Sequence, residues 1–209
     1  MAIATLSRFT VPLASDQSAS AQGMLMPKMK YRFRVMFENF GVSTPTTELT
    51  KQVAEAKRPT AAFKDIPIEV YNSTFHLAGK GTWETMAIKL RDDVTGSVSK
   101  LVGEQMQKQF DFFEQASAAA GSDYKFTLRL EILDGGNGAS TPNVLETWEC
   151  YGCYITKVDY DTNNYATQEA LTISLTIQPD NCLQTSGTIG VGVPVTRLNG
   201  TGTTGGGAR

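Results

Sequence analysis

The chain has 209 residues, a formal net charge of −2, 41% hydrophobic residues and 19% charged residues. This length is enough for one sizeable hydrophobic core, and the near-neutral charge gives no general reason to expect affinity for nucleic acid or anionic membranes. No apolar run approaches the roughly 20 residues that a membrane-spanning helix needs. We therefore expect a folded soluble protein with no direct membrane anchoring.

The first 29 residues mix small and polar side chains without sustained periodicity. They are predicted to form an N-terminal arm, residues 1–29, which ends in three methionines and a leucine around Pro27. One interpretation is a flexible terminus. The other is an arm whose apolar end, Met24, Leu25 and Met26, docks on a neighbouring subunit, because methionine adapts to irregular surfaces.

The central part of the chain alternates between apolar and polar residues, which predicts β-strands. The alternating runs are 30–38, 66–70, 74–77, 82–91, 124–133 and 144–155. Pro67 falls inside one of them. Within sheets, proline is confined to edge strands or to the first residue of a strand, so this run is expected at a sheet edge or at a strand start. One segment, 94–120, has apolar residues every three or four positions and predicts a helix at about residues 96–117.

The residue types that commonly catalyse reactions or bind metals form no recognisable site in this sequence. His76 is the only histidine, and no nucleophile or metal partner can be placed beside it, so we expect a structural or surface role. Asp92 and Asp93 are adjacent acids, but no further acid falls at a spacing that completes an oxygen cage. A helix start, whose dipole favours carboxylates, is the better interpretation. We therefore expect no enzyme activity, no cofactor and no metal.

The three cysteines do not predict a disulfide scaffold. Cys150 and Cys153 form a CxxC inside a strand-like run, whereas a redox pair needs a helix start. A zinc knuckle needs a second pair, and Cys182 is alone. Positions three apart on a regular strand point to opposite faces, so these two thiols are not expected to meet. We expect small apolar packing residues, with an intermolecular disulfide as the alternative that an odd count permits.

The segment 152–180 predicts two strands joined by a turn-favouring connection, DYDTNNY. In its second run apolar residues alternate with uncharged polar residues, so one face is apolar and the other is rich in hydroxyl groups. The apolar positions are Leu171, Ile173, Leu175 and Ile177, and the polar positions are Thr172, Ser174, Thr176 and Gln178. Residues 183–209 are rich in Gly and Thr and are predicted to be a C-terminal arm, disordered or ordered by a partner.

These elements predict a mainly β fold over residues 30–182. It is an antiparallel β-sandwich or partly open barrel with one flanking α-helix, plus N- and C-terminal arms. Such a fold leaves sheet edges open, and an open edge invites pairing with another chain unless it is covered or charged. Repeated head-to-tail pairing closes into a ring when the rotation allows it.

Three stretches resemble the tail tube proteins of contractile-tailed bacteriophages, which are similar in fold to the tube proteins of type VI secretion systems. The first is 54–93, where the resemblance lies in the spacing of Pro59, Ile66-Pro67, Ala78-Gly79 and the strand of Trp83. The second is the helix that follows directly. The third is 152–182, with the run VDYDTNNYATQEALTISLTI. The resemblance is one of strand order and turn residues, and the two arms depart from the compact family version.

The resemblance implies a homo-hexamer whose subunits join their sheets into one continuous inner barrel. Stacked rings would form a tail tube inside a contractile sheath, with sheath, baseplate and terminator proteins as partners. The protein would be assembled in the host cytoplasm and reside in the virion tail. The genomic DNA would pass through the lumen during ejection without specific binding.

A conduit for DNA should present few cations inward, because each phosphate that contacts Lys or Arg adds a salt-dependent term to the affinity. We predict that the polar positions Thr172, Ser174, Thr176 and Gln178 face the lumen. Met24, Leu25 and Met26 are predicted to make inter-ring contacts.

Three alternatives remain open. Within the same class, the chain is the tube protein of a secretion-type contractile system or a baseplate tube initiator. In another class, it is a ligand-binding β-sandwich, for example a carbohydrate-binding module. That function would need an aromatic platform at the surface, formed by Trp83, Trp148 or Tyr165.

Overall fold

The computed structural model describes residues 5–10, 23–25, 27–42, 46–134, 142–166 and 168–186. The chain divides into two units, Met1–Arg32 and Phe33–Arg209. Within the first unit, β1 (Thr5–Thr10) pairs antiparallel with β2 (Gly23–Leu25). Met24 and Leu25 of the predicted inter-ring contact therefore lie in β2, and Met26 lies outside the described residues.

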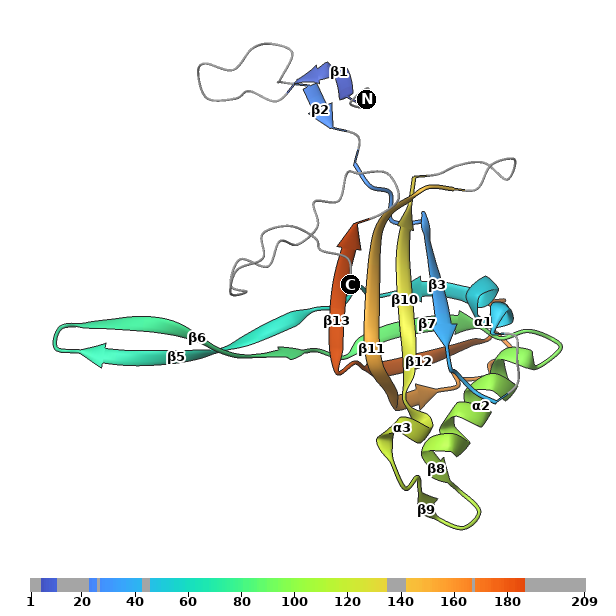
Figure 1. Ribbon diagram of the computed structural model, residues 1–209. Helices are drawn as coiled ribbons and strands as arrows, with labels where there is room; N and C mark the ends of the chain where they lie inside the picture. Colours follow the sequence, from blue (N-terminus) through green and yellow to red (C-terminus); the bar gives the residue numbers. More distant parts are fainter. Residues whose placement is uncertain are drawn as a thin grey trace, which may run out of the picture. The chain divides into compact units, whose positions relative to one another are not determined.

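The second unit contains the hydrophobic core and the remaining described elements (Figure 1). In chain order these are β3 (Phe33–Glu38), α1 (Thr47–Gln52), β4 (Val53–Ala56), β5 (Ala61–Val70), β6 (Ser73–Trp83), β7 (Met86–Arg91), α2 (Ser97–Gln109), β8 (Phe110–Asp111), β9 (Ala116–Ser117), α3 (Gly121–Tyr124), β10 (Phe126–Leu133), β11 (Val144–Asp159), β12 (Thr172–Gln178) and β13 (Asn181–Ser186). No helix in the described part of the chain is long and apolar enough to cross a membrane.

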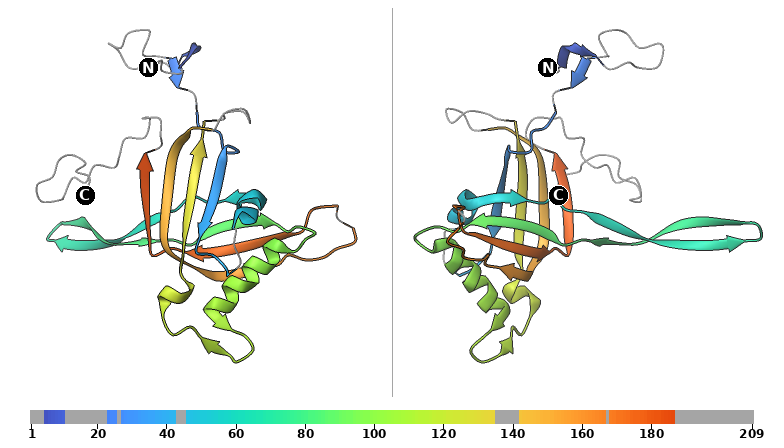
Figure 2. Two further views of the ribbon diagram at one scale, coloured as in Figure 1. Left: turned by 45° about the vertical axis from the view of Figure 1, so that its right-hand side comes forward. Right: turned by 180° about the vertical axis from the view of Figure 1, so that it is seen from behind.

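Seven strands are hydrogen-bonded into one antiparallel assembly that folds over on itself. The order is β3-β10-β11-β12-β7-β4, and β13 also pairs with β11. The first part of β11 lies between β10 and β13, and its second part pairs with β12. We call β3, β10, β13 and the first part of β11 sheet I, and we call β4, β7, β12 and the second part of β11 sheet II. Figure 2 shows the two sheets crossing as two layers. The predicted mainly β, antiparallel fold is confirmed, and the sheets do not close into a barrel.

The bend of β11 between the two sheets is located at Gly152. This residue has a φ of +65°, and a Cβ added to it would overlap the carboxylate of Asp180. The register with β10 shifts at the same point, as expected for a β-bulge, in which an extra residue bends the strand. The bulge turns Cys150 and Cys153 both into the core, where each is 0% exposed. The expectation that the two thiols point to opposite faces is therefore wrong, because it assumed a regular strand.

The core lies between the two sheets and α2. The alternation predicted for β12 is confirmed, because Ile173, Leu175 and Ile177 are each at most 1% exposed. They pair across the ladder with the buried residues of β7, which are Met86, Ile88 and Leu90. From α2, the buried apolar side chains are Val98, Leu101 and Val102.

α2 ends at Gln109 rather than at about residue 117. The side chain of Asp111 accepts hydrogen bonds from the backbone N–H of Phe113 (2.9 Å) and of the next residue (3.3 Å), which closes a turn instead of continuing the helix. Phe110 and Phe113 consequently leave the apolar face of the helix and are 37% and 94% exposed. Residues 116 and 117, placed in the helix by the sequence, form β9 instead.

The described residues also contain elements that the sequence did not predict. Two short helices, α1 and α3, accompany the expected flanking helix. β13 pairs with β11 through Ser186, so the first four residues of the predicted C-terminal arm belong to sheet I. Residues 187–209 of that arm lie outside the described residues.

Candidate assembly surfaces

β5 and β6 form a long hairpin that pairs with none of the other described strands. Their ladder runs from Ala61–Trp83 at the root to Val70–Ser73 at the tip, and Figures 1 and 2 show it projecting well away from both sheets. The sequence predicted only two short strand runs in this region. A two-stranded hairpin is at best marginally stable by itself in water, so its stability outside the sheets depends on further contacts.

One face of the hairpin is apolar and exposed. Ile66 pairs with Leu77 and Ile68 pairs with Phe75, so their side chains share a face. We call this face, completed by Val70, the hairpin stripe. The exposed fractions of its side chains are 46% for Ile66, 37% for Ile68, 49% for Val70, 47% for Phe75 and 47% for Leu77. Side chains of this kind are normally covered, and a contiguous apolar patch marks an interaction site.

The opposite face of the hairpin is polar and satisfied within the hairpin. His76 Nδ1 lies 2.7 Å from Asp65 Oδ2, and the Thr74 hydroxyl donates to Glu69 Oε2 at 2.6 Å. His76 is therefore an exposed residue hydrogen-bonded to Asp65, in line with the structural or surface role expected from the sequence. The contrast between the two faces marks the stripe as a candidate interaction surface.

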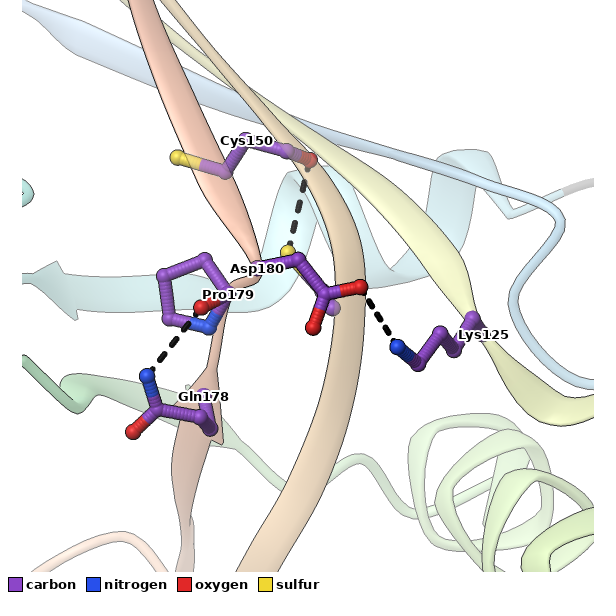
Figure 3. A network of polar contacts seen from close by, with 6 residues as sticks. Lys125, Cys150, Gln178, Pro179 and Asp180 are labelled. Atoms are coloured by element: carbon purple, nitrogen blue, oxygen red, sulfur yellow. Dashed lines mark hydrogen bonds and ion pairs between the residues drawn. The ribbon is translucent and has the colours of Figure 1, made fainter. Parts of the chain in front are cut away.

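The root of the hairpin is held by residues of β12 and β13. Trp83 packs against the core and donates from Nε1 to Asn181 Oδ1 at 3.2 Å. Gln178 donates from Nε2 to the carbonyl of Trp83 at 2.8 Å and to the carbonyl of Pro179 at 3.1 Å, the second contact being visible in Figure 3. Gln178, one of the four predicted lumen residues, is thus half-buried at the hairpin root. These bonds fix the direction in which the hairpin leaves the body.

Both sheets end in open edges. In the described part of the chain, β3 and β13 of sheet I each pair with one strand only, and so does β4 of sheet II. The free side of the second part of β11 is different, because the side chain of Gln109 bonds both backbone groups of Ile155 at 2.8 and 3.2 Å. The edges of β3 and β13 therefore offer unpaired backbone groups to another chain.

A second exposed apolar surface follows α2. Phe110, Phe112 and Phe113 are 37%, 57% and 94% exposed, and we call the segment 110–113 the aromatic turn. Asp111 holds it by the two backbone bonds described above and by a bond from Gln107 Nε2 at 2.7 Å. The hydrogen bonds that the Asp111 carboxylate accepts from these backbone N–H groups lower the pKa of Asp111. The turn is therefore a fixed structure rather than a loose loop.

The outward face of sheet II carries the predicted lumen residues. Thr172, Ser174 and Thr176 point away from the core and are exposed or half-buried. Cationic side chains share this face, because Ser174 pairs with Lys89, Thr172 with Arg91 and Thr176 with Lys157. The prediction that this face lines the lumen rested on the absence of basic residues from β12. The neighbouring strands β7 and β11 bring basic side chains to the same face.

The outward face of sheet I is charged in a different way. Arg34 forms an ion pair with Glu131, and Arg129 Nη2 lies 3.1 Å from Glu149 and 3.6 Å from Glu38. These five side chains, from β3, β10 and β11, contain two cations and three carboxylates and have a net charge of about −1 when all are ionised. Each arginine of the network is thus neutralised by a carboxylate on the same face.

The remaining candidate residues lie apart from one another. Trp83 and Trp148 are partly buried against the core, while Tyr165 is fully exposed, so they do not form an aromatic platform. The carboxylate of Asp93 accepts bonds from Thr95, Ser97 and the backbone of Val98 at the start of α2, which confirms the helix-start interpretation. These bonds lower the pKa of Asp93 to about 2. No three potential metal ligands come together in the described ranges.

The three cysteines are free and buried. Cys182 of β13 pairs directly with Cys150 across the ladder, and Cys153 donates to the carbonyl of Cys150 at 3.3 Å. Burial raises the pKa of Cys153 to about 12, so this thiol is not a nucleophile at neutral pH. The prediction of small apolar packing residues is confirmed. Their burial inside one subunit argues against the intermolecular disulfide.

Neither a family model nor a curated protein matches the chain in sequence. Solved structures match it in fold. The tube-terminating cap of the anti-feeding prophage has a TM-score of 0.57 and 14% identity, over 84% of this chain and 99% of that one. A chain of the sheath–tube complex of the PVC extracellular contractile injection system has a TM-score of 0.54 and 12% identity, over 77% and 92%. The SPP1 tail tube has a TM-score of 0.51 and 12% identity, over 77% and 80%. The chain therefore has the fold shared by tail tube and tube terminator proteins.

Proposed function

We propose that the protein is a structural tube protein, and that copies of it form rings that stack into the hollow tail tube of a phage-like particle. The observation that carries this proposal is the hairpin stripe. Its five apolar side chains are 37–49% exposed on an element that projects from the body. Covering half of such a side chain contributes roughly 1 kcal/mol, so the stripe supports an interface of about 5 kcal/mol before the cost of association.

The open edges of sheet I support ring formation. Because neighbouring strands in β3-β10-β11-β13 alternate in direction, the edge strand β13 runs opposite to β3. When β13 of one copy pairs with β3 of the next, the antiparallel alternation continues across the junction. The contact is head-to-tail, as a closed ring requires.

The size of such a ring follows from sheet geometry. With strands about 4.8 Å apart and tilted by about 40°, four strands add roughly 8 Å of barrel diameter per copy. The six copies that the family resemblance implies give about 24 strands and a diameter of roughly 48 Å. Barrels of about 16–18 strands already hold an aqueous channel, so a ring of this size has a wide lumen.

Geometry favours the outward face of sheet I as the lining of this lumen. A ring closed through β3 and β13 turns that face inward, and its arginines are neutralised by glutamates. The β12 face also mixes the two signs, because Lys89 pairs with Glu55 and Lys157 lies 3.6 Å from Asp159, so the strand pairing and not the charge selects sheet I. We therefore place the lumen at sheet I, and we propose that DNA or another cargo passes without specific binding.

Electron microscopy of the purified protein tests the proposal. We expect hollow rods or rings from the wild type, and loss of both at the same concentration from the variant Ile68→Ser combined with Phe75→Ser. Glu69→Gln, on the polar face of the same hairpin, is the matched control and should assemble normally. Circular dichroism checks that each variant is folded. A wild-type chain that stays monomeric at high concentration would overturn the proposal.

A tube terminator is the second candidate, because the anti-feeding prophage cap matches 84% of this chain. A terminator would form single rings, whereas a tube protein forms rods of many rings, so the same micrographs separate the two. Secretion-type tubes and baseplate initiators are distinguished by the partner that copurifies with the native particle. In each case the role that we propose is structural and not catalytic.

A further inference from the structure

We infer that the aromatic turn is the surface on which the hairpin stripe of a second copy docks; this inference rests on the proposed function. Stacking and ring closure need head-to-tail contacts, in which two different surfaces meet. A stripe that met a second stripe would produce a closed two-fold pair and no tube. The hairpin stripe therefore requires a complementary surface elsewhere on the same chain.

The aromatic turn matches the stripe in chemistry. Its three phenylalanines fall within four consecutive residues and are 37–94% exposed. The rings of Phe110 and Phe112 are already packed edge to face, with centroids 5.4 Å apart. The stripe offers aliphatic side chains and one aromatic ring, Phe75, and aromatic rings of this kind dominate the energetics of interfaces.

The turn is also preorganised for binding. Asp111 fixes its backbone through bonds from Phe113, from Glu114 and from the side chain of Gln107. A surface that is ordered before binding loses less conformational entropy when the partner arrives. The hairpin is ordered in the same sense, because Gln178 and Asn181 hold its root.

Charges beside the two surfaces are complementary. Lys64 lies in β5 two residues before Ile66, where the register with β6 shifts, and it is exposed. Glu114 follows the aromatic turn directly and is exposed. A docked stripe that brings this lysine near this glutamate would gain an ion pair, which favours one register of docking.

Cysteine cross-linking tests the contact. The native thiols are at most 4% exposed, so they do not react with the cross-linker. Tagged Ser73→Cys chains, changed beside Val70 at the tip of the stripe, and untagged Gln115→Cys chains, changed just after the aromatic turn, are mixed, assembled and treated with a short bismaleimide. We expect a cross-linked dimer that contains one chain of each kind. Tyr165→Cys, at a fully exposed position outside the stripe and the turn, is the control and should give no such product with Ser73→Cys.

Charge reversal provides a second test that does not alter the apolar residues. Lys64→Glu and Glu114→Lys alone should each raise the concentration needed for assembly by about two- to fivefold, the range that an exposed ion pair supports. The double variant should return to within about twofold of the wild type, as a coupled pair does in a double-mutant cycle.

The outcomes separate this inference from the proposed function. Rods that form without the mixed cross-link and without charge rescue would overturn the inference and leave the tube function standing. Cross-linking of Ser73→Cys chains to one another, with no mixed product, would also overturn it. A wild-type protein that forms neither rods nor rings would overturn the proposed function itself.

Discussion

Lys125 Nζ lies 2.5 Å from Asp180 Oδ2, and this ion pair joins the start of β10 to the connection between β12 and β13 (Figure 3). Asp180 also donates its backbone N–H to the carbonyl of Tyr151 at 3.1 Å, and its carboxylate occupies the space beside Gly152. The pair raises the pKa of Lys125. It therefore lies directly over the bulge at which β11 passes from sheet I to sheet II.

The first prediction concerns this bulge. Gly152→Ala should lower the free energy of unfolding by about 1–3 kcal/mol, because the φ of +65° strains an alanine. The new Cβ would in addition displace Asp180. Urea denaturation measures the change. Gly103→Ala in α2, where a Cβ meets nothing within 4 Å, is the matched control and should stabilise the protein by about 0.5–1 kcal/mol. Equal effects at the two glycines would contradict the role of the bulge.

The second prediction concerns pH. The pKa of Asp93 is lowered from 3.8 to about 2 by the bonds from Thr95, Ser97 and Val98. Its stabilising contribution is therefore fully present above pH 3.8 and is lost as the pH falls toward 2. Asp93→Asn should remove this part of the acid dependence. Urea midpoints measured between pH 2 and pH 5 check it, and an unchanged slope in the variant would show that Asp93 does not contribute.

The third prediction concerns the edge of β11. Gln109→Ala should destabilise the protein by about 1–3 kcal/mol, because it leaves the N–H and C=O groups of Ile155 without their side-chain partner. Thermal unfolding measures the effect. Gln107→Ala, on the exposed side of the same helix, should change stability by no more than about 0.5 kcal/mol. If the two variants were equally stable, the side-chain cap on β11 would have no energetic role.

The fourth prediction concerns the thiols. None of Cys150, Cys153 and Cys182 should react with iodoacetamide in the native protein at neutral pH, because all three are buried and the pKa of Cys153 is about 12. All three should react after denaturation. Intact-mass spectrometry counts the modified thiols. Rapid labelling of a native cysteine would reopen the possibility of an intermolecular disulfide.

The sequence was sufficient where burial follows a simple period. β12 is half-buried along its whole length, so the alternation of Ile173, Leu175 and Ile177 with polar residues predicted both the strand and its inward face. It was insufficient at Gly152, where one residue with a positive φ reverses the side-chain directions that follow. A glycine inside a strand pattern is the available signal for such a bulge. The end of α2 was missed because Asp111 forms a turn that the helical spacing of the phenylalanines conceals.

The candidate assembly surfaces were harder to predict. Ile66, Ile68 and Val70 alternate with polar residues as a half-buried strand does, but the described part of the chain leaves them 37–49% exposed. Periodicity indicates that a face is apolar and does not indicate whether the covering surface belongs to the same molecule. The charged residues on the outward face of sheet II were missed for a related reason. Lys89 lies on the same face as Thr172 only because β7 pairs with β12, and these two strands are far apart in the sequence.

The continuity of β11 through both sheets has a consequence for how the subunit unfolds. Because one backbone forms ladders with β10 and β13 on one side of the bulge and with β12 on the other, we expect the two layers to unfold together. Amide protons of Trp148 and Val158 should accordingly exchange with solvent at similar free energies of opening. A subunit of this design is expected to resist mechanical force as one cooperative unit. That property suits a protein whose copies form a long hollow filament.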